Sequence, residues 1–381
     1  MRTPVDLAVR KYRFAFILNT TVGNMTRYQN LRKYAEKAAD IEFVWAPISA
    51  YPPLQIARRF SAMPHLWLAR AWIFWQIAPL FCRLERIDAV MVHLFEAELA
   101  LAARACIIKS PLLVSSTDEA PAFDEETYPL YEYQKQKSRW RRRLRLRLDR
   151  WRGRHVDLFI PFTTWTAGLI RTGCSLPASK VHPIHVGIDL EIWTRRGRRE
   201  PCADARVKIL FVGGEFARKG GDLLLSLFRR HYSDRAELHL VTNQAPPLSD
   251  DHVHVYSDLL PNDAKLVRLF ADCDLLVVPT SADLAPWVFL EAMAMECPPI
   301  GTAVGAIGEF IEDGVTGFVV PGGDADTLNA RIQQLLNDPK LRGTMGRAGR
   351  KKIEEDYDAA KNVPAILDLM RFAVDTFRRR G

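Results

Sequence analysis

The stretch from Leu275 to Pro321 places the strongest constraint on what this chain can fold into. Its opening apolar run, 275–279, has the length and composition of a buried parallel strand and ends in a polar loop. A helix-forming segment, 289–295, and a second short apolar run follow. This order is typical of a parallel α/β sheet, in which ligands bind beyond the carboxyl ends of the strands. Two carboxylates, Asp283 and Glu291, occur at that position.

The same alternation of apolar runs and helix-forming segments repeats in two halves of the chain. Strands are predicted at 13–19, 41–47, 89–94, 112–116, 156–161, 207–212, 238–241, 252–256 and 275–278. Between the halves, 194–206 is polar and charged and has no apolar periodicity, as expected of a linker. We therefore expect an α/β protein with two Rossmann-like parallel-sheet domains facing a central cleft, at 1–195 and 206–358. The last helix, about 359–381, is expected to pack back on the first domain.

The composition of the chain limits the kinds of molecule that it is expected to bind. A chain of 381 residues can form two substantial cores, and 48% apolar and 26% charged residues are ordinary for a soluble protein. The net charge of +8 and the pI near 9.2 favour anionic partners such as a nucleotide, an acidic membrane surface or nucleic acid. The six cysteines include no close pair that would suggest a metal site, so we expect reduced thiols and a cytoplasmic location.

Two segments bear on contact with a membrane. The tryptophan-rich run 63–81 is bracketed by prolines and interrupted by Arg70, so it falls short of the roughly 20 apolar residues that span a bilayer. The arginine-rich run 138–154 has Trp and Leu at helical spacing. It is interpreted either as a surface helix packed on the core or as a helix on anionic lipid, which would place the protein at the inner face of the membrane. Nucleic acid is not an expected partner, because no nucleic-acid-binding module accompanies the arginines.

A glycine-rich turn provides a second candidate site. The strand predicted at 207–212 ends in Gly213, and GGEFARKGG then precedes a predicted helix. A helix N-terminus after such a turn offers backbone N–H groups and a positive dipole to a diphosphate, and Arg218 and Lys219 add charge. The spacing matches neither the Walker A loop nor GxGxxG, and alone it fits a solvated loop equally well. With Asp283 and Glu291, however, cations suit a diphosphate while carboxylates suit the hydroxyls of ribose and sugar.

At these residues the chain resembles a known family. The second half resembles the nucleotide-binding domain of family-4 retaining glycosyltransferases (glycosyltransferase group 1) with the GT-B fold. The matching segments are ILFVGGEFARKGGDLLL, FADCDLLVVPTSAD, FLEAMAMECPPI, GEFIEDGVTGFVVPGGD and LLNDPKLRGTMGRAG. The first half resembles the family more loosely, through WTAGLIRTGCSLPASKVHPIHVGIDLEIW. The resemblance implies transfer of a sugar from a nucleotide-sugar with retained anomeric configuration and no required metal or other cofactor. The acceptor would be a glycan, a lipid-linked molecule or a small molecule.

The resemblance also assigns roles to particular positions. It implies that Lys219 binds the diphosphate, Glu291 the ribose hydroxyls and Asp283 the sugar. The full donor-binding set is Gly213, Gly214, Arg218, Lys219, the Thr242–Asn243 step, Asp283, Leu284, Ala285, Pro286, Trp287 and Glu291. The acceptor-side set is Gly23, His93, Thr117 and Asp118, and the catalytic set is Asp118, Asp283 and Lys219.

Three positions depart from the family pattern. Asp283 stands where members have a glutamate, so its reach is one methylene shorter. Gly214 stands where many members have a phosphate-binding arginine, which Arg218 could replace. Many members have a histidine after the fourth strand, where this chain has Asp118; His93 is a second candidate for that role. The departures at Asp283 and Gly214 leave open an inactive nucleotide-sugar-binding protein. The tryptophan-rich and arginine-rich segments leave open a peripheral membrane scaffold of the same fold.

Overall fold

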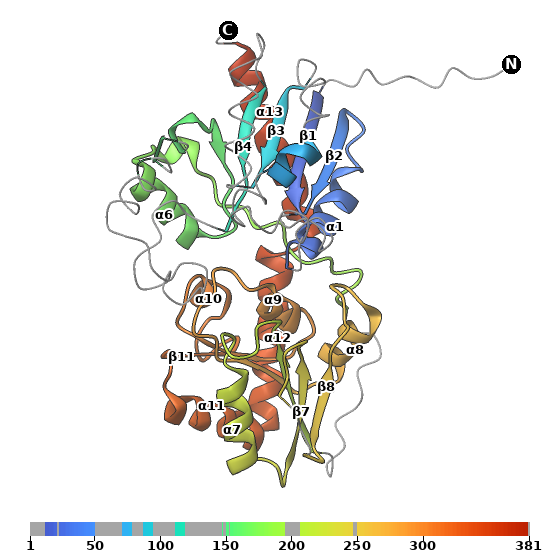
Figure 1. Ribbon diagram of the computed structural model, residues 1–381, viewed down its shortest axis with the longest axis vertical. Coiled ribbons are helices and arrows are strands. Elements are labelled where there is room, and N and C mark those ends of the chain that lie inside the picture. The colour runs from blue at the N-terminus through green and yellow to red at the C-terminus, as the bar shows by residue number, and fades with distance from the viewer. Residues whose placement is uncertain are drawn as a thin grey trace, which may run out of the picture. The chain divides into compact units, whose positions relative to one another are not determined.

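Two parallel sheets form the framework of the chain in the computed structural model (Figure 1). The first sheet has the strand order β2-β1-β3-β4-β5, and the second has the order β11-β10-β9-β6-β7-β8. All strand pairs in both sheets are parallel. The structure describes residues 12–20, 23–49, 71–77, 87–93, 111–118, 147, 150–151, 153–194, 206–246 and 250–379.

The first unit contains the strands of the first half of the chain and the last helix. Its strands are β1 (Tyr12–Asn19), β2 (Ile41–Ile48), β3 (Ala89–Val92), β4 (Leu112–Ser115) and β5 (Leu158–Phe159), and its helices include α1 (Gly23–Ala35), α6 (Thr164–Cys174) and α13 (Ala359–Arg378). β3, β4 and β5 are buried along their whole length, which explains why they are apolar without alternation.

The second unit contains the strands of the second half. Its strands are β6 (Val207–Val212), β7 (Ala236–Val241), β8 (Val253–Tyr256), β9 (Leu275–Val278), β10 (Pro299–Thr302) and β11 (Phe318–Val320). Its helices are α7 (Gly221–His231), α8 (Ala264–Asp272), α9 (Trp287–Ala294), α10 (Ile307–Phe310), α11 (Ala325–Asn337) and α12 (Pro339–Asp356). Aspartates cap three of these helices: the side chains of Asp263, Asp324 and Asp338 accept hydrogen bonds from the backbone of the first turn.

The fold class predicted from the sequence is confirmed, because both units are parallel α/β structures. Each of the nine strands predicted by range is present, and the short apolar run after the helix-forming segment 289–295, also predicted as a strand, forms β10. The sequence did not predict β11. It predicted a helix at 262–271 capped near Asn262, and the cap of α8 is the next residue, Asp263. Asn262 instead has a left-handed backbone, with φ of 61°, and its side chain accepts a hydrogen bond from Trp193 Nε1 at 2.9 Å.

The last helix contributes to the first unit, in which residues from Ala360 onward are grouped (Figure 1). The Tyr12 hydroxyl donates a hydrogen bond to Asp375 at 2.9 Å, and Arg371 forms a bidentate ion pair with Asp40. Because these pairs join the two ends of the chain, the first unit requires residues separated by more than 300 positions.

Among the described residues, the second unit comprises those from Gly187 to Ala359. Gly187 and Ile188 lie beside Tyr357, and Ile188 exchanges backbone hydrogen bonds with Tyr357 and Ala359 at 2.7 and 3.0 Å. Gly187 has φ of +90°, and a Cβ atom there would lie 2.5 Å from the Tyr357 carbonyl oxygen, so only glycine fits. The fully buried Trp193 lies just before the predicted linker, of which 195–205 fall outside the described residues.

Several sequence predictions concern residues outside the described part of the chain. They are the helix at 96–108, most of the arginine-rich helix at 138–154 and most of the tryptophan-rich run at 63–81. Within that last run, residues 71–77 are helical. Among the described residues, no helix has the length and apolar character needed to cross a bilayer.

Gly220 lies in the turn after β6 and packs against the loop after β9. It has φ of +80°, and a Cβ atom there would lie 2.2 Å from the Pro279 carbonyl oxygen. We expect Gly220→Ala to lower the free energy of unfolding by on the order of 2 kcal/mol, through backbone strain and steric overlap. Urea denaturation followed by circular dichroism measures this. The matched control is Gly214→Ala, because Gly214 has open space around its Cβ position. Equal midpoints for the two variants would contradict the prediction.

Candidate functional site

The second sheet has a topological switch point between β6 and β9. β6 pairs with β7 on one side and with β9 on the other. The connections that follow β6 and β9 therefore lead away in opposite directions along the sheet. In open parallel sheets, ligands bind at this point, beyond the carboxyl ends of the strands. Lys219 and Asp283, both predicted to bind the donor, follow these two strands.

Lys219 and Asp283 meet at the switch point although 64 positions separate them in the sequence. Lys219 Nζ forms an ion pair with Asp283 Oδ2. Each side chain is only 14% exposed, so the pair is largely withdrawn from water and its attraction is stronger than at the surface. The second oxygen of Asp283 accepts a hydrogen bond from the Leu284 backbone N–H at 2.9 Å, which orients the carboxylate.

Arg218 forms hydrogen bonds within the loop after β6 and to the loop after β9. Its guanidinium forms two hydrogen bonds to Glu215, each 2.9 Å long, and a third to the Ala282 carbonyl oxygen. Its own carbonyl oxygen accepts hydrogen bonds from the Ser281 backbone and side chain and from Thr280. The hydrogen bond to Arg218 also lowers the pKa of Glu215 below its usual value. Arg218 was predicted as a substitute phosphate ligand, but in this structure its guanidinium binds protein groups on both loops.

The glycine-rich turn leaves space for the Lys219 side chain. A Cβ atom on Gly213 would lie 2.8 Å from Lys219 Cγ, so glycine permits the close approach. Gly214 faces open space, and the absence of a side chain there leaves the turn uncovered. In the neighbouring loop after β7, Thr242 is buried and bonds to the Gln244 backbone, whereas Asn243 is exposed.

The segment from Asp283 to Trp287 is held against the loop after β10. The Ala306 backbone N–H donates to the Leu284 carbonyl oxygen at 2.8 Å. Gly305 has φ of +57°, and a Cβ atom there would lie 2.2 Å from the Asp283 carbonyl oxygen. Ala285 and Pro286 are buried, and α9 begins at Trp287. This contact fixes the backbone that presents Asp283.

Glu291 lies in α9 and is buried, with 5% of its surface exposed. Burial raises the pKa of its carboxyl group to about 8. No described residue forms a hydrogen bond or an ion pair with that carboxyl group. Glu291 is therefore mostly protonated at neutral pH, which the sequence did not predict, and a ligand with hydroxyl donors would favour its ionised form.

Several polar side chains of the first unit lie near its own topological switch point, which is between β1 and β3. His93 follows β3 and Asp118 follows β4, and His93 Nε2 lies 3.2 Å from Asp118 Oδ1 and 3.3 Å from Thr117 Oγ1. Gly23, the fourth residue of the predicted acceptor set, begins α1 after β1. The structure thus brings three of these four residues into contact.

Two further buried groups surround Asp118, and the sequence did not identify either. Arg27, on α1, is 2% exposed and donates to the Ser116 carbonyl oxygen at 3.1 Å, with its guanidinium over the Phe162 ring. His185 is 5% exposed, and burial together with the charge of Arg27 lowers its pKa to about 3. Burial alone would raise the pKa of Asp118, but His93 and Arg27 more than offset it, so the pKa lies below the usual value. Asp118 is therefore an ionised carboxylate beside a buried cation.

Comparison with known proteins adds family information to this geometry. Residues 206–338 match a family model described as "Glycosyl transferases group 1", and residues 13–187 match one described as "Glycosyl transferase 4-like domain". A D-inositol 3-phosphate glycosyltransferase from Arthrobacter sp. is 37% identical over 183 residues, which cover 42% of this chain and 43% of that protein. The matched regions span between about a quarter and three-fifths of the first curated relatives' own length.

Solved structures with the same fold cover nearly the whole chain. The sucrose-phosphate synthase of Thermosynechococcus elongatus has a TM-score of 0.72 and 18% identity, and the match covers 96% of this chain and all of that one. The Anabaena protein HepE, solved in complex with UDP and glucose, has a TM-score of 0.67 and 14% identity, covering 95% and 99% of the two chains. The predicted GT-B fold is confirmed.

The pKa of Glu291 leads to a prediction about stability. A carboxyl group with a raised pKa contributes stability that is fully present below pH 4.5 and is lost as the pH rises to about 8. We expect the wild type to lose on the order of 3 kcal/mol relative to Glu291→Gln between pH 5 and pH 8, because the glutamine never ionises. Chemical denaturation at four pH values measures the difference. Glu354→Gln is the control, since this side chain is 51% exposed. Parallel curves for wild type and Glu291→Gln would refute the prediction.

Proposed function

The chain belongs to the group 1 glycosyltransferases, whose two domain models match most of its length, and from this membership we propose that it transfers a sugar from a nucleotide-sugar to an acceptor with retained anomeric configuration. The observation that best supports the proposal is the contact of Lys219 with Asp283 at the switch point of the second sheet. This contact provides a cation for a diphosphate and a carboxylate for sugar hydroxyls in one place.

We propose that groups of the bound donor replace the contact that Lys219 and Asp283 make with each other. Its diphosphate would take the place of Asp283 beside Lys219, and Asp283 would then accept hydrogen bonds from the sugar hydroxyls. The buried Glu291 would accept hydrogen bonds from the ribose hydroxyls, which favour its ionised form and compensate its burial. A uridine nucleotide-sugar is the first donor to test, because the HepE structure contains UDP and glucose.

The proposed reaction is a substitution at the anomeric carbon. The bond between C1 and the diphosphate oxygen breaks, and the acceptor oxygen forms its bond to C1 on the same face. The acceptor hydroxyl loses its proton to the departing diphosphate. Lys219 and the N-terminus of α7 would stabilise the charge that develops on the diphosphate, so we propose that no metal ion takes part in the transfer.

We propose that the cluster in the first unit serves the acceptor. Asp118 has a lowered pKa and is a weak base, which favours a role in orienting the acceptor hydroxyl over removing its proton. His93 lies between Asp118 and Thr117 and would fix their orientation. A glycan or a lipid-linked molecule remains the proposed acceptor class.

We also propose a cytoplasmic protein in peripheral contact with anionic membrane. The three cysteines described by the structure, Cys174, Cys273 and Cys297, are buried thiols, as is common in a reducing compartment. Flotation with phosphatidylserine-containing liposomes tests the membrane contact.

The donor site is tested by substituting its charged residues. We expect Lys219→Ala and Glu291→Ala each to lower turnover at least 100-fold with the accepted nucleotide-sugar, in buffer containing EDTA, while circular dichroism stays unchanged. Lys351→Ala is the matched control, because that side chain is 74% exposed. Near-normal turnover in both site variants would refute the assignment. Donor binding without transfer by the wild type would instead favour an inactive nucleotide-sugar-binding protein.

The acceptor cluster is tested by Asp118→Asn. We expect this variant to lose about 100-fold in kcat, the usual size of one positioned acid–base or orienting group, and to bind UDP as the wild type does. Steady-state kinetics and isothermal titration calorimetry measure the two quantities. A change in UDP affinity as large as the change in kcat would contradict an acceptor-side role.

A further inference from the structure

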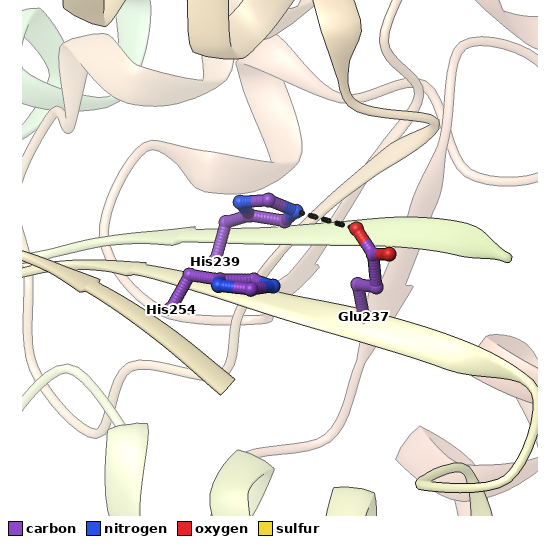
Figure 2. Close-up of side chains that lie close together, drawn as sticks. All are labelled: Glu237, His239 and His254. Atoms are coloured by element: carbon purple, nitrogen blue, oxygen red, sulfur yellow. Dashed lines mark ion pairs between the residues drawn. The ribbon is translucent and has the colours of Figure 1, made fainter. Parts of the chain in front are cut away.

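A cluster of metal-ligating side chains lies on the edge of the second sheet, apart from the residues proposed to bind the donor (Figure 2). Glu237 and His239 are two positions apart on β7, so both side chains project from the same face of the sheet. His254 lies on β8, directly opposite His239 in the register of the two strands. One ligand atom from each of the three residues lies within 4.8 Å of the others.

The buried member of the cluster has one ring nitrogen without a hydrogen-bond partner. His239 is 6% exposed, and its Nδ1 lies 3.0 Å from the Tyr256 hydroxyl. Its Nε2 forms no hydrogen bond within the described part of the chain, although Glu237 Oε2 is 3.4 Å away. Buried polar atoms are rarely left unsatisfied, so this nitrogen points to a missing partner.

In one tautomer of His239, the contact with Tyr256 makes a cation the suitable partner. When Nδ1–H donates to the Tyr256 oxygen, the lone pair of Nε2 faces the Glu237 carboxylate, and two acceptors then require a cation between them. Metal-binding histidines usually donate their second ring N–H to an oxygen in this way.

We propose that Glu237, His239 and His254 bind a divalent transition-metal ion of the zinc class, which ties the edge strand β8 to β7. Imidazole and carboxylate ligands suit Zn²⁺, Co²⁺ and Ni²⁺, whereas Ca²⁺ and Mg²⁺ select oxygen ligands. Zinc lies about 2.0–2.2 Å from such ligands, so the three atoms have to close to roughly 3.5 Å from one another. The partly exposed His254 side chain can rotate to achieve this.

The neighbouring charge and the position in the sheet define the role of this site. Lys208 Nζ lies 4.0 Å from Glu237 Oε2, so a metal ion competes with one existing cation for that carboxylate. Among the described strands, β8 pairs only with β7 and forms the edge of the sheet. None of the three ligands belongs to the proposed donor set. The ion therefore stabilises the second unit and takes no part in the transfer, and its binding is tested independently of activity.

The test uses the untagged full-length protein, first stripped with EDTA and then titrated with Zn²⁺ by calorimetry. We expect one equivalent to bind and the midpoint of thermal unfolding to rise with Zn²⁺ concentration. His254→Ala should abolish this binding, and Glu237→Gln should weaken it at least tenfold. His231→Ala is the matched control, because it removes a histidine of the same unit outside the cluster. These substitutions avoid the buried His239, whose loss could affect folding.

Cobalt provides a second readout that depends on the ligands. We expect Co²⁺ to give visible absorption bands with the wild type and with His231→Ala, and none with His254→Ala. Wild type that binds no Zn²⁺ would overturn the proposal and leave only the ion-pair contact between His239 and Glu237. Equal Zn²⁺ affinity in wild type and His254→Ala would overturn it as well, since the ion would then bind elsewhere.

Discussion

The ion pair between Lys219 and Asp283 is the interaction on which the geometry of the second unit's switch point depends. Two charges with 14% exposure are tolerated only if each has a partner, so the loops after β6 and β9 must meet. Gly220 and Gly305 make this possible, because side chains there would overlap backbone atoms of 279 and 283. Arg218 adds hydrogen bonds between the same loops. A donor diphosphate would meet a cation that the fold has already positioned.

The same physical rule shapes the first unit. A polar cluster lies at the carboxyl ends of its strands and consists of the buried Arg27 and His93 and the half-buried Asp118. Each group is acceptable there because another compensates it. Glu291 in the second unit differs from these residues, since no described residue offers its carboxyl group a partner. That contrast is the physical reason for proposing that Glu291 binds a ligand rather than stabilises the fold.

Much of this arrangement could be predicted from the sequence. Short apolar runs specify the parallel strands, and polar residues immediately after them identify the strand ends, where Lys219, Asp283 and Asp118 lie. β11 was missed because a three-residue strand has too short an apolar run. Arg27 and His185 were missed because burial is not visible in a helix or loop that contains other polar residues.

The sequence by itself determined the two parallel α/β units, the positions of their strands and the residue types at the strand ends. Only the tertiary structure decided which of these residues touch. Lys219 meets Asp283 because β6 and β9 are neighbours at a switch point, and His239 faces His254 because of the register between β7 and β8. Strand order and register arise from the packing of segments remote in sequence. Burial follows from the same packing, and with it the raised pKa of Glu291.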